Sequence, residues 1–275
     1  MDMPATPASA AQAWRAVEVC GVRDQRAMQW CDHVAEEVPV ALEFNGISHA
    51  VMMASPADLE DFAYGFALTE GIVDTAAQIL DCDWSSAALG YTVHLMIAAS
   101  CFARLKDMRR NLTGRTGCGL CGTESLSHAV RQIEPVRTSA RFSAAAVRHA
   151  LAALRDRQVL LTVSGATHAA AWCMADGEIA WIREDVGRHN ALDKLLGALA
   201  RAGCEASRGF VLVTSRASFE MVQKTAVAGV ALLVAVSGVT SLAVEVAQRS
   251  GLTLAGFARG RDVSLYSHPQ RFELD

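Results

Sequence analysis

The chain has 275 residues, of which 52% are hydrophobic and 20% are charged, and its formal net charge is −4. This composition is typical of a soluble globular protein, and the length allows one large domain or two small ones. The net charge argues against a broad nucleic-acid-binding face, because nonspecific binding to phosphates depends on many clustered Lys and Arg side chains.

The N-terminal residues, MDMPATPASAAQAW, lack the basic region and apolar core of a secretory signal. We therefore expect residues 1–15 to form a disordered tail and the protein to be cytoplasmic. Eight cysteines are present, but only Cys118 and Cys121 lie close together in the sequence. In a reducing compartment a structural disulfide framework is not expected.

One uncharged stretch, residues 225–244, is long enough to cross a bilayer. Glycines interrupt it, however, and its middle, ALLVAVS, is typical of a buried strand. We interpret the stretch as a helix end, a buried strand, a turn and a new helix, and we expect no membrane span.

The first half of the chain predicts an α+β domain over residues 16–131. Asn45-Gly46 between β-prone runs predicts a hairpin over residues 38–55. Ser55-Pro56 then resembles a helix start, and the helix should end at Gly71. The remaining expected elements are a strand at 91–98, a helix at 99–110 and a Gly-rich loop at 111–124 that carries the two cysteines.

From about Phe142 strands and helices alternate more regularly, which predicts an α/β domain over residues 143–275 after a linker near 132–142. Asp176-Gly177 indicates a hairpin turn. The expected strands are 159–165, 178–182, 209–215, 231–237 and 252–258. The expected helices are 143–156, 190–203, 219–229 and 241–251.

Polar residues gather in the links that follow the expected strands of this α/β half, where open sheets of this class bind their ligands. Helix N-termini there offer free N–H groups and partial positive charge to an anion. Arg259 and Arg261 add guanidinium groups that suit phosphate. The candidate ligand residues in the links before the last strand are His168, Arg188, His189, Asn190, Ser215, Arg216 and Ser218.

These residues have a simpler explanation too. Ser, Thr, Asp and Gly at such links are ordinary caps and turns. His189 with Asp193, and Asn190 with Lys194, are four apart on the polar face expected for helix 190–203, so they could form surface pairs. Five polar links in a row nevertheless favour a phosphate-bearing ligand.

The stretch RTGCGLCGTES, residues 115–125, is compatible with more than one kind of cysteine site. Zinc needs four ligands, but no second CxxC exists and His128 is the only nearby histidine. The zinc deaminase motif is also absent. We therefore expect no structural metal.

Two thiol chemistries remain open on the residues alone. A thiol–disulfide redox protein could use a CxxC pair, although such pairs usually lie near a βαβ unit. A sulfur carrier could hold a persulfide on Cys118, because the neighbouring glycines leave its sulfur uncrowded and Arg115 could favour the thiolate. Cys121 could then protect or release that sulfur by exchange.

Five stretches together resemble the formate dehydrogenase accessory sulfurtransferase family, FdhD, and the resemblance extends over most of the chain from about Val38 onward. They are MMASPADLEDFAYGFALTEGIV (52–73), CGLCG (118–122), REDVGRHNALDKLLG (183–197), SFEMVQKTAVAG (218–229) and GLTLAGFARG (251–260).

The resemblance implies a cytoplasmic, homodimeric sulfur carrier with a cytidine-deaminase-like α/β domain. Such a protein takes sulfur from a cysteine desulfurase and delivers it to molybdenum (or tungsten) bis(molybdopterin guanine dinucleotide), the cofactor of formate dehydrogenase. By resemblance Cys118 bears the persulfide and Cys121 assists it. The residues that match the cofactor-binding part of the family are Phe257, Ala258, Arg259, Gly260, Arg261 and Asp262.

The leading hypothesis is therefore a sulfurtransferase, with a redox-active dithiol protein and a noncatalytic cofactor-binding chaperone as alternatives. Two departures from the family pattern fall on the expected ligand edge. Thr214-Ser215-Arg216 stands where the family tends to have Ser-Gly-Arg, and Gly238-Val239-Thr240 where it tends to have Ala-Pro-Thr. Both bear on the affinity for the ligand.

Overall fold

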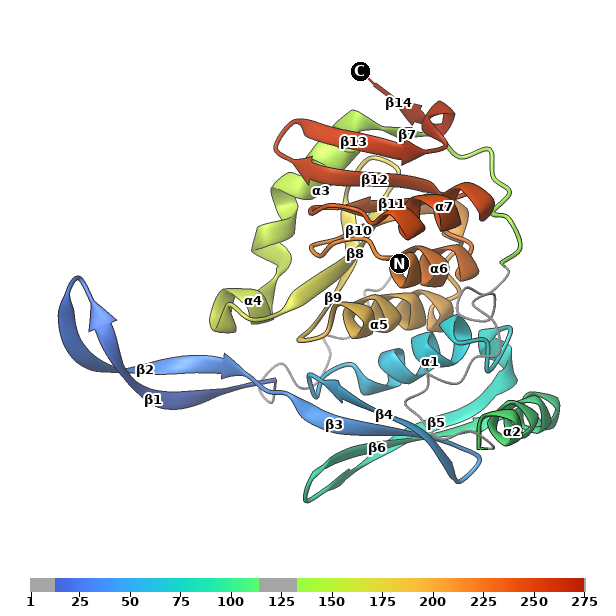
Figure 1. Cartoon of the computed structure of the whole chain (residues 1–275), viewed down its shortest axis with the longest axis horizontal. Helices are drawn as coiled ribbons and strands as arrows, with labels where there is room; N and C mark the ends of the chain where they lie inside the picture. The colour runs from blue at the N-terminus through green and yellow to red at the C-terminus, as the bar shows by residue number, and fades with distance from the viewer. Residues whose placement is uncertain (1–12, 114–132, 275) are drawn as a thin grey trace.

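The computed structural model describes residues 13–113 and 133–274. Its first part contains a β-hairpin that projects from the body (Figure 1), formed by antiparallel strands β1 (Trp14–Arg23) and β2 (Arg26–Ala35). The sequence patterns did not predict this hairpin, and two residues of the expected tail, Trp14 and Arg15, belong to β1.

A four-stranded sheet follows, with the order β4-β3-β6-β5. Its strands are β3 (Val38–Phe44), β4 (Ile47–Ala54), β5 (Ile79–Ala87) and β6 (Gly90–Ile97), and its helices are α1 (Leu59–Thr69) and α2 (Ala99–Thr113). The hairpin expected at 38–55 is confirmed, because Asn45 and Gly46 both have the positive φ that a tight two-residue turn requires. Phe62 of α1 is fully buried and packs in one cluster with Leu42 and Phe44 of β3, which gives this part its own core.

The second part is built on a six-stranded sheet with the order β13-β12-β11-β10-β8-β9. Its strands are β8 (His168–Met174), β9 (Ile179–Asp185), β10 (Gly209–Val213), β11 (Leu232–Ala235), β12 (Thr253–Arg259) and β13 (Asp262–Ser267). Strands β10, β11 and β12 are parallel, whereas the other pairings are antiparallel.

Helices α5 (Arg188–Arg201), α6 (Phe219–Val227) and α7 (Ser241–Arg249) cover one face of this sheet, and α3 (Ala144–Arg157) crosses the other (Figure 1). The short strands β7 (Phe142–Ser143) and β14 (Phe272–Glu273) pair beside it. Ser143 caps α3 by accepting a hydrogen bond from the Ala146 N–H. The chain therefore has a mixed α/β fold, as expected.

One expected strand is wrong. Residues 159–165 form helix α4 (Val159–Ser164), which ends at Gly165 with a φ of 68°. The Glu184 carboxylate accepts hydrogen bonds from the Leu160 and Leu161 N–H groups at 2.8 and 2.9 Å, and this stabilises the start of the helix. The pattern of a short apolar run such as VLLTVS fits a strand and a helix equally well. Here the helix forms because the Glu184 carboxylate, which is 24 residues from Leu160 and 23 from Leu161, binds their N–H groups.

The two parts pack directly on each other through α1 and α5. Gly65 and Gly197 lie at the crossing, where a Cβ on Gly65 would come within 1.8 Å of the Asp193 carbonyl oxygen. A Cβ on Gly197 would come equally close to the carbonyl oxygen of Asp61. Only glycine permits this separation of the two helix backbones.

Candidate ligand-binding edge

The carboxyl ends of β10, β11 and β12 meet at one edge of the large sheet, because these strands are parallel. Strand β8 runs the other way, so its first residue, His168, lies at that same edge opposite Asp185 at the end of β9. The Thr214 N–H donates to the Ala169 carbonyl at 3.1 Å and joins the start of β8 to the link after β10. His168 thus reaches the expected edge by beginning a strand instead of following one.

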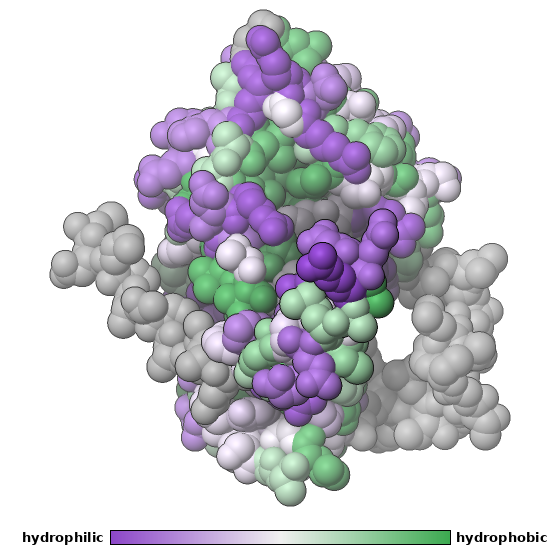
Figure 2. Space-filling view, turned by 90° about the vertical axis from the view of Figure 1, so that its left-hand side faces the viewer, coloured by the Kyte–Doolittle hydropathy of each residue, from purple (hydrophilic) through white to green (hydrophobic). Residues whose placement is uncertain are grey.

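The links that leave this edge lie side by side. Ala217 forms an isolated parallel bridge with Val239, in which its N–H donates to the Gly238 carbonyl at 3.1 Å. The Phe257 N–H donates to the Ser237 carbonyl at 2.9 Å. The structure therefore brings three of the expected polar links together. Viewed onto this edge, hydrophilic side chains surround hydrophobic ones (Figure 2).

The link after β10 supplies a helix N-terminus with little capping. Ser218 is the N-cap residue of α6, but its hydroxyl accepts no capping bond, and its buried Oγ has no hydrogen-bond partner among the described residues. Arg216 is exposed, whereas Ser215 is buried and donates its hydroxyl to the Arg216 carbonyl at 3.0 Å. An unused hydroxyl beside free N–H groups and a guanidinium suits an oxygen-rich anion.

Two histidines stand at the same edge. His189 Nε2 lies 3.0 Å from Glu220 Oε2, and this contact lowers the pKa of the Glu220 carboxyl. Burial, followed by the nearby positive charge of Arg188, lowers the pKa of His168. At neutral pH His168 is therefore mainly the neutral imidazole, which can both donate and accept a hydrogen bond.

The 257–262 segment contains the most strained backbone of the edge. Phe257 has a φ of 51°, which is an outlier for a bulky side chain, and the residue is 49% exposed. Gly238 makes room for that ring, because a Cβ there would come within 3.0 Å of it. The bulge between Gly256 and Arg259 turns the end of β12 toward solvent. Strain of this kind is typical of ligand sites.

The other residues of this segment differ in what they can offer a ligand. Ala258 is fully buried, so only its backbone is available to a ligand. Arg259 Nε donates to the Val236 carbonyl at 3.1 Å, which fixes its direction along the edge. Gly260, with a φ of 56°, makes the turn to β13, and Arg261 and Asp262 are exposed beside it. The guanidinium groups expected at this end of the edge are therefore present.

One predicted ligand residue points elsewhere. The Asn190 side-chain amide donates to the Met53 carbonyl at 2.8 Å and to Asp185 Oδ1 at 3.1 Å. The polar helix face expected for Asn190, Asp193 and Lys194 is also wrong, since all three are buried against α1 and the residues before it. In the structure Asn190 connects the two parts of the chain.

The sequence patterns missed a set of buried ion pairs that makes this connection. Lys194 Nζ lies 2.7 Å from Asp185 Oδ2 and donates to the Ser55 carbonyl at 2.9 Å. Lys224 Nζ lies 3.0 Å from Asp193 Oδ2 and donates to Thr69 Oγ1 at 2.9 Å. The signal in the sequence was a charged residue at an otherwise apolar helix position.

A third set of charged side chains joins the two parts of the chain nearer the surface. Arg183 donates from Nη2 to Asp61 Oδ2 at 2.8 Å, and Arg201 contacts the other oxygen of the same carboxylate. Asp58 beside them has a raised pKa because burial outweighs the attraction of Arg183. Much of the 183–197 stretch therefore connects the second part of the chain to α1 and the residues before it.

The predicted cysteine site, Cys118 and Cys121, lies outside the described residues. Within residues 13–113 and 133–274 there is no cluster of His, Cys, Asp or Glu side chains that could hold a metal ion. Among the helices of the described parts, none is both long and apolar enough to cross a membrane.

Comparison with known proteins decides the family. The family model described as FdhD/NarQ family matches residues 35–273. The chain belongs to this family. Family membership confirms the resemblance drawn from the 52–73, 118–122, 183–197, 218–229 and 251–260 stretches.

Individual family members match over nearly the whole chain. A protein of Variovorax paradoxus named sulfur carrier protein FdhD is 56% identical over 98% of this chain and 96% of its own length. One of Cupriavidus necator with the same name is 57% identical over 88% of this chain and 84% of its own.

A solved structure shares the fold. The crystal structure of a putative formate dehydrogenase accessory protein from Desulfotalea psychrophila superimposes with a TM-score of 0.74 at 22% identity. It covers 95% of this chain and 100% of the other. The whole described architecture, including both parts, is therefore that of a known fold.

Proposed function

We propose that this protein is a sulfurtransferase that accepts sulfur on Cys118 from a cysteine desulfurase. It then transfers that sulfur to molybdenum (or tungsten) bis(molybdopterin guanine dinucleotide), which formate dehydrogenase requires. The observation that carries the proposal is the 56% identity over 98% of the chain to a protein named a sulfur carrier. That name does not favour the alternative of a thiol–disulfide redox protein.

The loading step is an exchange of one sulfur atom. The Cys118 thiolate attacks the outer sulfur of the desulfurase persulfide, a new S–S bond forms on Cys118, and the old S–S bond breaks. The electron pair of the broken bond leaves on the desulfurase cysteine as a thiolate. The number of S–S bonds is unchanged, so loading needs no oxidant or reductant.

The unloading step assigns a role to Cys121. Its thiolate attacks the inner sulfur of the Cys118 persulfide, forms a Cys118–Cys121 disulfide and releases the outer sulfur as sulfide. The two electrons that convert the persulfide sulfur into sulfide come from the two thiols. A low-molecular-weight thiol then reduces the disulfide.

The ligand-binding edge is where we place the cofactor substrate. Its guanine dinucleotide arms carry pyrophosphates, which suit Arg216, Arg261 and the uncapped start of α6 at Ser218. The exposed ring of Phe257 offers a stacking surface for a base. The same proposal includes a homodimer, a cytoplasmic location and a cytidine-deaminase-like arrangement of residues 143–275.

The test is to incubate the protein with a cysteine desulfurase and free cysteine, and to record nonreducing intact mass and peptide maps. We expect one added sulfur atom on Cys118 that is absent in Cys118→Ala. Because unloading through Cys121 also leaves a Cys118–Cys121 disulfide, the deciding variant is Cys121→Ala, in which that release cannot occur. No added sulfur on Cys118 in this variant would overturn the proposal and favour redox chemistry.

The edge assignment is tested with guanosine diphosphate. We expect salt-sensitive binding that Arg216→Ala and Arg261→Ala each weaken by about tenfold, corresponding to the roughly 1.4 kcal/mol of one charge-assisted contact. Arg148→Ala on α3, away from the edge, is the control. If all three variants bound guanosine diphosphate as tightly as the wild type, the polar links would be ordinary helix caps and turns and not a ligand site.

A further inference from the structure

Four hydrogen-bond donors converge on one fully buried carboxylate at the ligand-binding edge, that of Asp185 at the end of β9. Its Oδ1 accepts from the Gly187 N–H at 2.7 Å and from the Asn190 amide at 3.1 Å. Its Oδ2 accepts from the Ser55 N–H at 3.0 Å and lies 2.7 Å from Lys194 Nζ. Both oxygens are therefore occupied by groups of the protein, so Asp185 does not itself bind a ligand.

The donors come from both parts of the chain. Ser55 precedes α1, and its hydroxyl also accepts a hydrogen bond from the Val186 N–H at 3.2 Å. The Asn190 amide nitrogen that binds the carboxylate also donates to the Met53 carbonyl at 2.8 Å. The N–H groups of Val186 and Gly187 are thus both held, the first by Ser55 and the second by the carboxylate. The first part of the chain therefore helps to fix the link between β9 and α5.

This link leads directly into residues of the ligand-binding edge. Gly187 is the N-cap of α5, and a Cβ there would come within 2.9 Å of the Asn190 amide nitrogen, so the turn is tightly packed. Arg188 and His189 occupy the first two positions of the helix, and His189 Nε2 lies 3.0 Å from Glu220 Oε2 of α6. Hydrogen bonds behind a site hold its side chains in place. The conformation of the link therefore decides where Arg188 and His189 stand.

Asp185 also acts on the edge through its charge. It lies opposite His168 in the pairing of β8 with β9. Burial, followed by Arg188, lowers the pKa of His168, the Asp185 carboxylate raises it, and His189 lowers it again. Removing the carboxylate should therefore leave a signature at the edge, a pKa of His168 that is lower still.

We propose that Asp185 is a positioning residue of the ligand-binding edge, and that it transmits the contact between the two parts of the chain to Arg188 and His189. Helix α2 of the first part ends at Thr113, five residues before Cys118. The carboxylate thus joins the part that leads into the cysteine pair to the part that carries the edge. The inference rests on the proposed function, because the ligand of this edge is the cofactor substrate assigned there.

The test measures guanosine diphosphate binding in two variants that leave the edge residues themselves unchanged. Asp185→Asn removes the charge and keeps the size of the side chain. Ser55→Ala removes the hydroxyl that holds the Val186 N–H, and it lies in the other part of the chain. Nuclear magnetic resonance titration of His168 in the full-length protein reports the charge at the edge.

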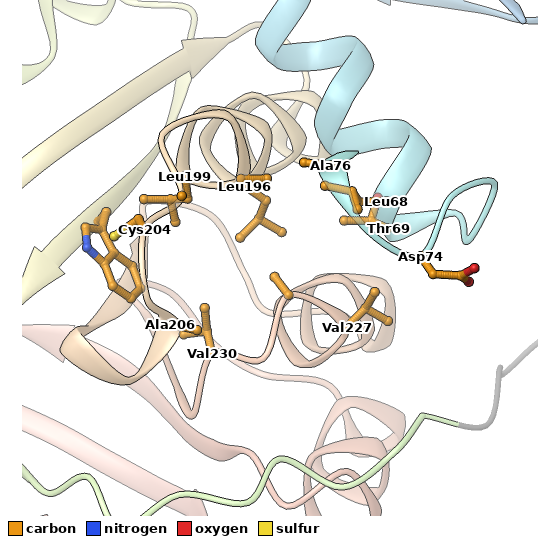
Figure 3. A pocket seen from close by; sticks show the side chains of 14 residues that line it. Leu68, Thr69, Asp74, Ala76, Leu196, Leu199, Cys204, Ala206, Val227 and Val230 are labelled. Atoms are coloured by element: carbon orange, nitrogen blue, oxygen red, sulfur yellow. The ribbon is translucent and has the colours of Figure 1, made fainter. Parts of the chain in front are cut away.

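Two controls disturb α5 away from its start. Asp193→Asn removes a carboxylate that is also buried and ion-paired, with Lys224. Leu199→Ala shortens a buried side chain that lines a pocket at the C-terminal end of α5 (Figure 3). Urea titrations of all four variants measure the loss of stability, so that an effect on binding is separated from a general loosening of the fold.

We expect Asp185→Asn to raise the dissociation constant of guanosine diphosphate about tenfold, the effect of one charge-assisted hydrogen bond, and to lower the pKa of His168. Ser55→Ala should raise the dissociation constant about threefold, the effect of one neutral hydrogen bond. Both controls should stay within about twofold of the wild type although they unfold more easily.

If Asp185→Asn bound guanosine diphosphate no more weakly than the two controls, Asp185 would only hold the parts of the chain together, and the inference would be wrong. Should Asp185→Asn fail to fold, Ser55→Ala decides, and an unchanged dissociation constant in that variant would overturn the inference. A wild type that bound no guanosine diphosphate would overturn the ligand-binding edge of the proposed function and this inference with it, whereas sulfur loading on Cys118 would be unaffected.

Discussion

Replacing Lys194 with Met tests whether buried ion pairs hold the two parts of the chain together. The Lys194 and Asp185 side chains are both 0% exposed and 2.7 Å apart, so removing the ammonium leaves a fully buried carboxylate. Breaking such a pair costs about 3–5 kcal/mol. Asp185 keeps hydrogen bonds from the N–H groups of Ser55 and Gly187 and from the Asn190 amide. We therefore expect the lower end, about 3 kcal/mol.

The measurement is the free energy of unfolding from urea titrations, with the melting temperature from calorimetry. A loss of 3 kcal/mol corresponds to a fall of roughly 6–12 °C in a domain of this size. The chain contains only three lysines, and Lys106 on α2 is exposed, so Lys106→Met is the matched control with an expected cost below about 1 kcal/mol.

The double variant with Asp185→Asn separates the pair from the packing. Because Asn carries no charge to bury, Lys194→Met should cost less in the Asp185→Asn background, with a coupling energy of about 1–3 kcal/mol. A Lys194→Met protein as stable as Lys106→Met would refute the argument. The contact between α1 and α5 would then depend on its apolar residues alone.

Three further outcomes follow from individual residues. Gly65→Ala should lower the free energy of unfolding by about 1–3 kcal/mol, since its Cβ would meet the Asp193 carbonyl oxygen; a cost below about 0.5 kcal/mol would contradict the close crossing. Alkylation at pH 8, mapped by mass spectrometry, should modify exposed Cys20 long before Cys82, whose pKa burial raises to about 12; equal rates would exclude that burial. The pKa of His168 is lower in the folded protein than in the unfolded chain, so the folded state favours the neutral imidazole. This contribution to stability is complete above the usual histidine pKa, and it is lost as the pH falls through the pKa of the folded state. The free energy of unfolding of the wild type should therefore fall relative to that of His168→Gln between about pH 7 and pH 5. If the two proteins showed the same dependence of stability on pH, the pKa of His168 would not be lowered by folding.

Local patterns along the sequence predicted most of the secondary structure in the second part. The hairpin at Asn45-Gly46, the helix start at Ser143 and the parallel run of β10, β11 and β12 all rest on contacts between near neighbours or on strong apolar periodicity. The same patterns placed polar links at the carboxyl ends of those strands. The expectation of a ligand edge there was possible because parallel strands must end together.

Tertiary contacts decided what local patterns left ambiguous. The apolar run at 159–164 became a helix because Glu184, distant in sequence, binds its first N–H groups. Asn190 and Lys194 carry polar side chains at helical spacing, which indicates a solvent face in isolation, but α1 covers that face.

The edge itself shows the same division. Composition and spacing identified Ser215, Arg216 and Ser218, and family resemblance identified the 257–262 segment. Only the fold shows that Ser218 has an unpartnered hydroxyl, that Phe257 is strained and exposed, and that Asn190 binds the neighbouring part of the chain. The sequence determines which chemical groups are available, because residue types set their charges and hydrogen-bonding atoms. Burial and neighbours distant in the chain decide which of those groups remain free to bind a ligand.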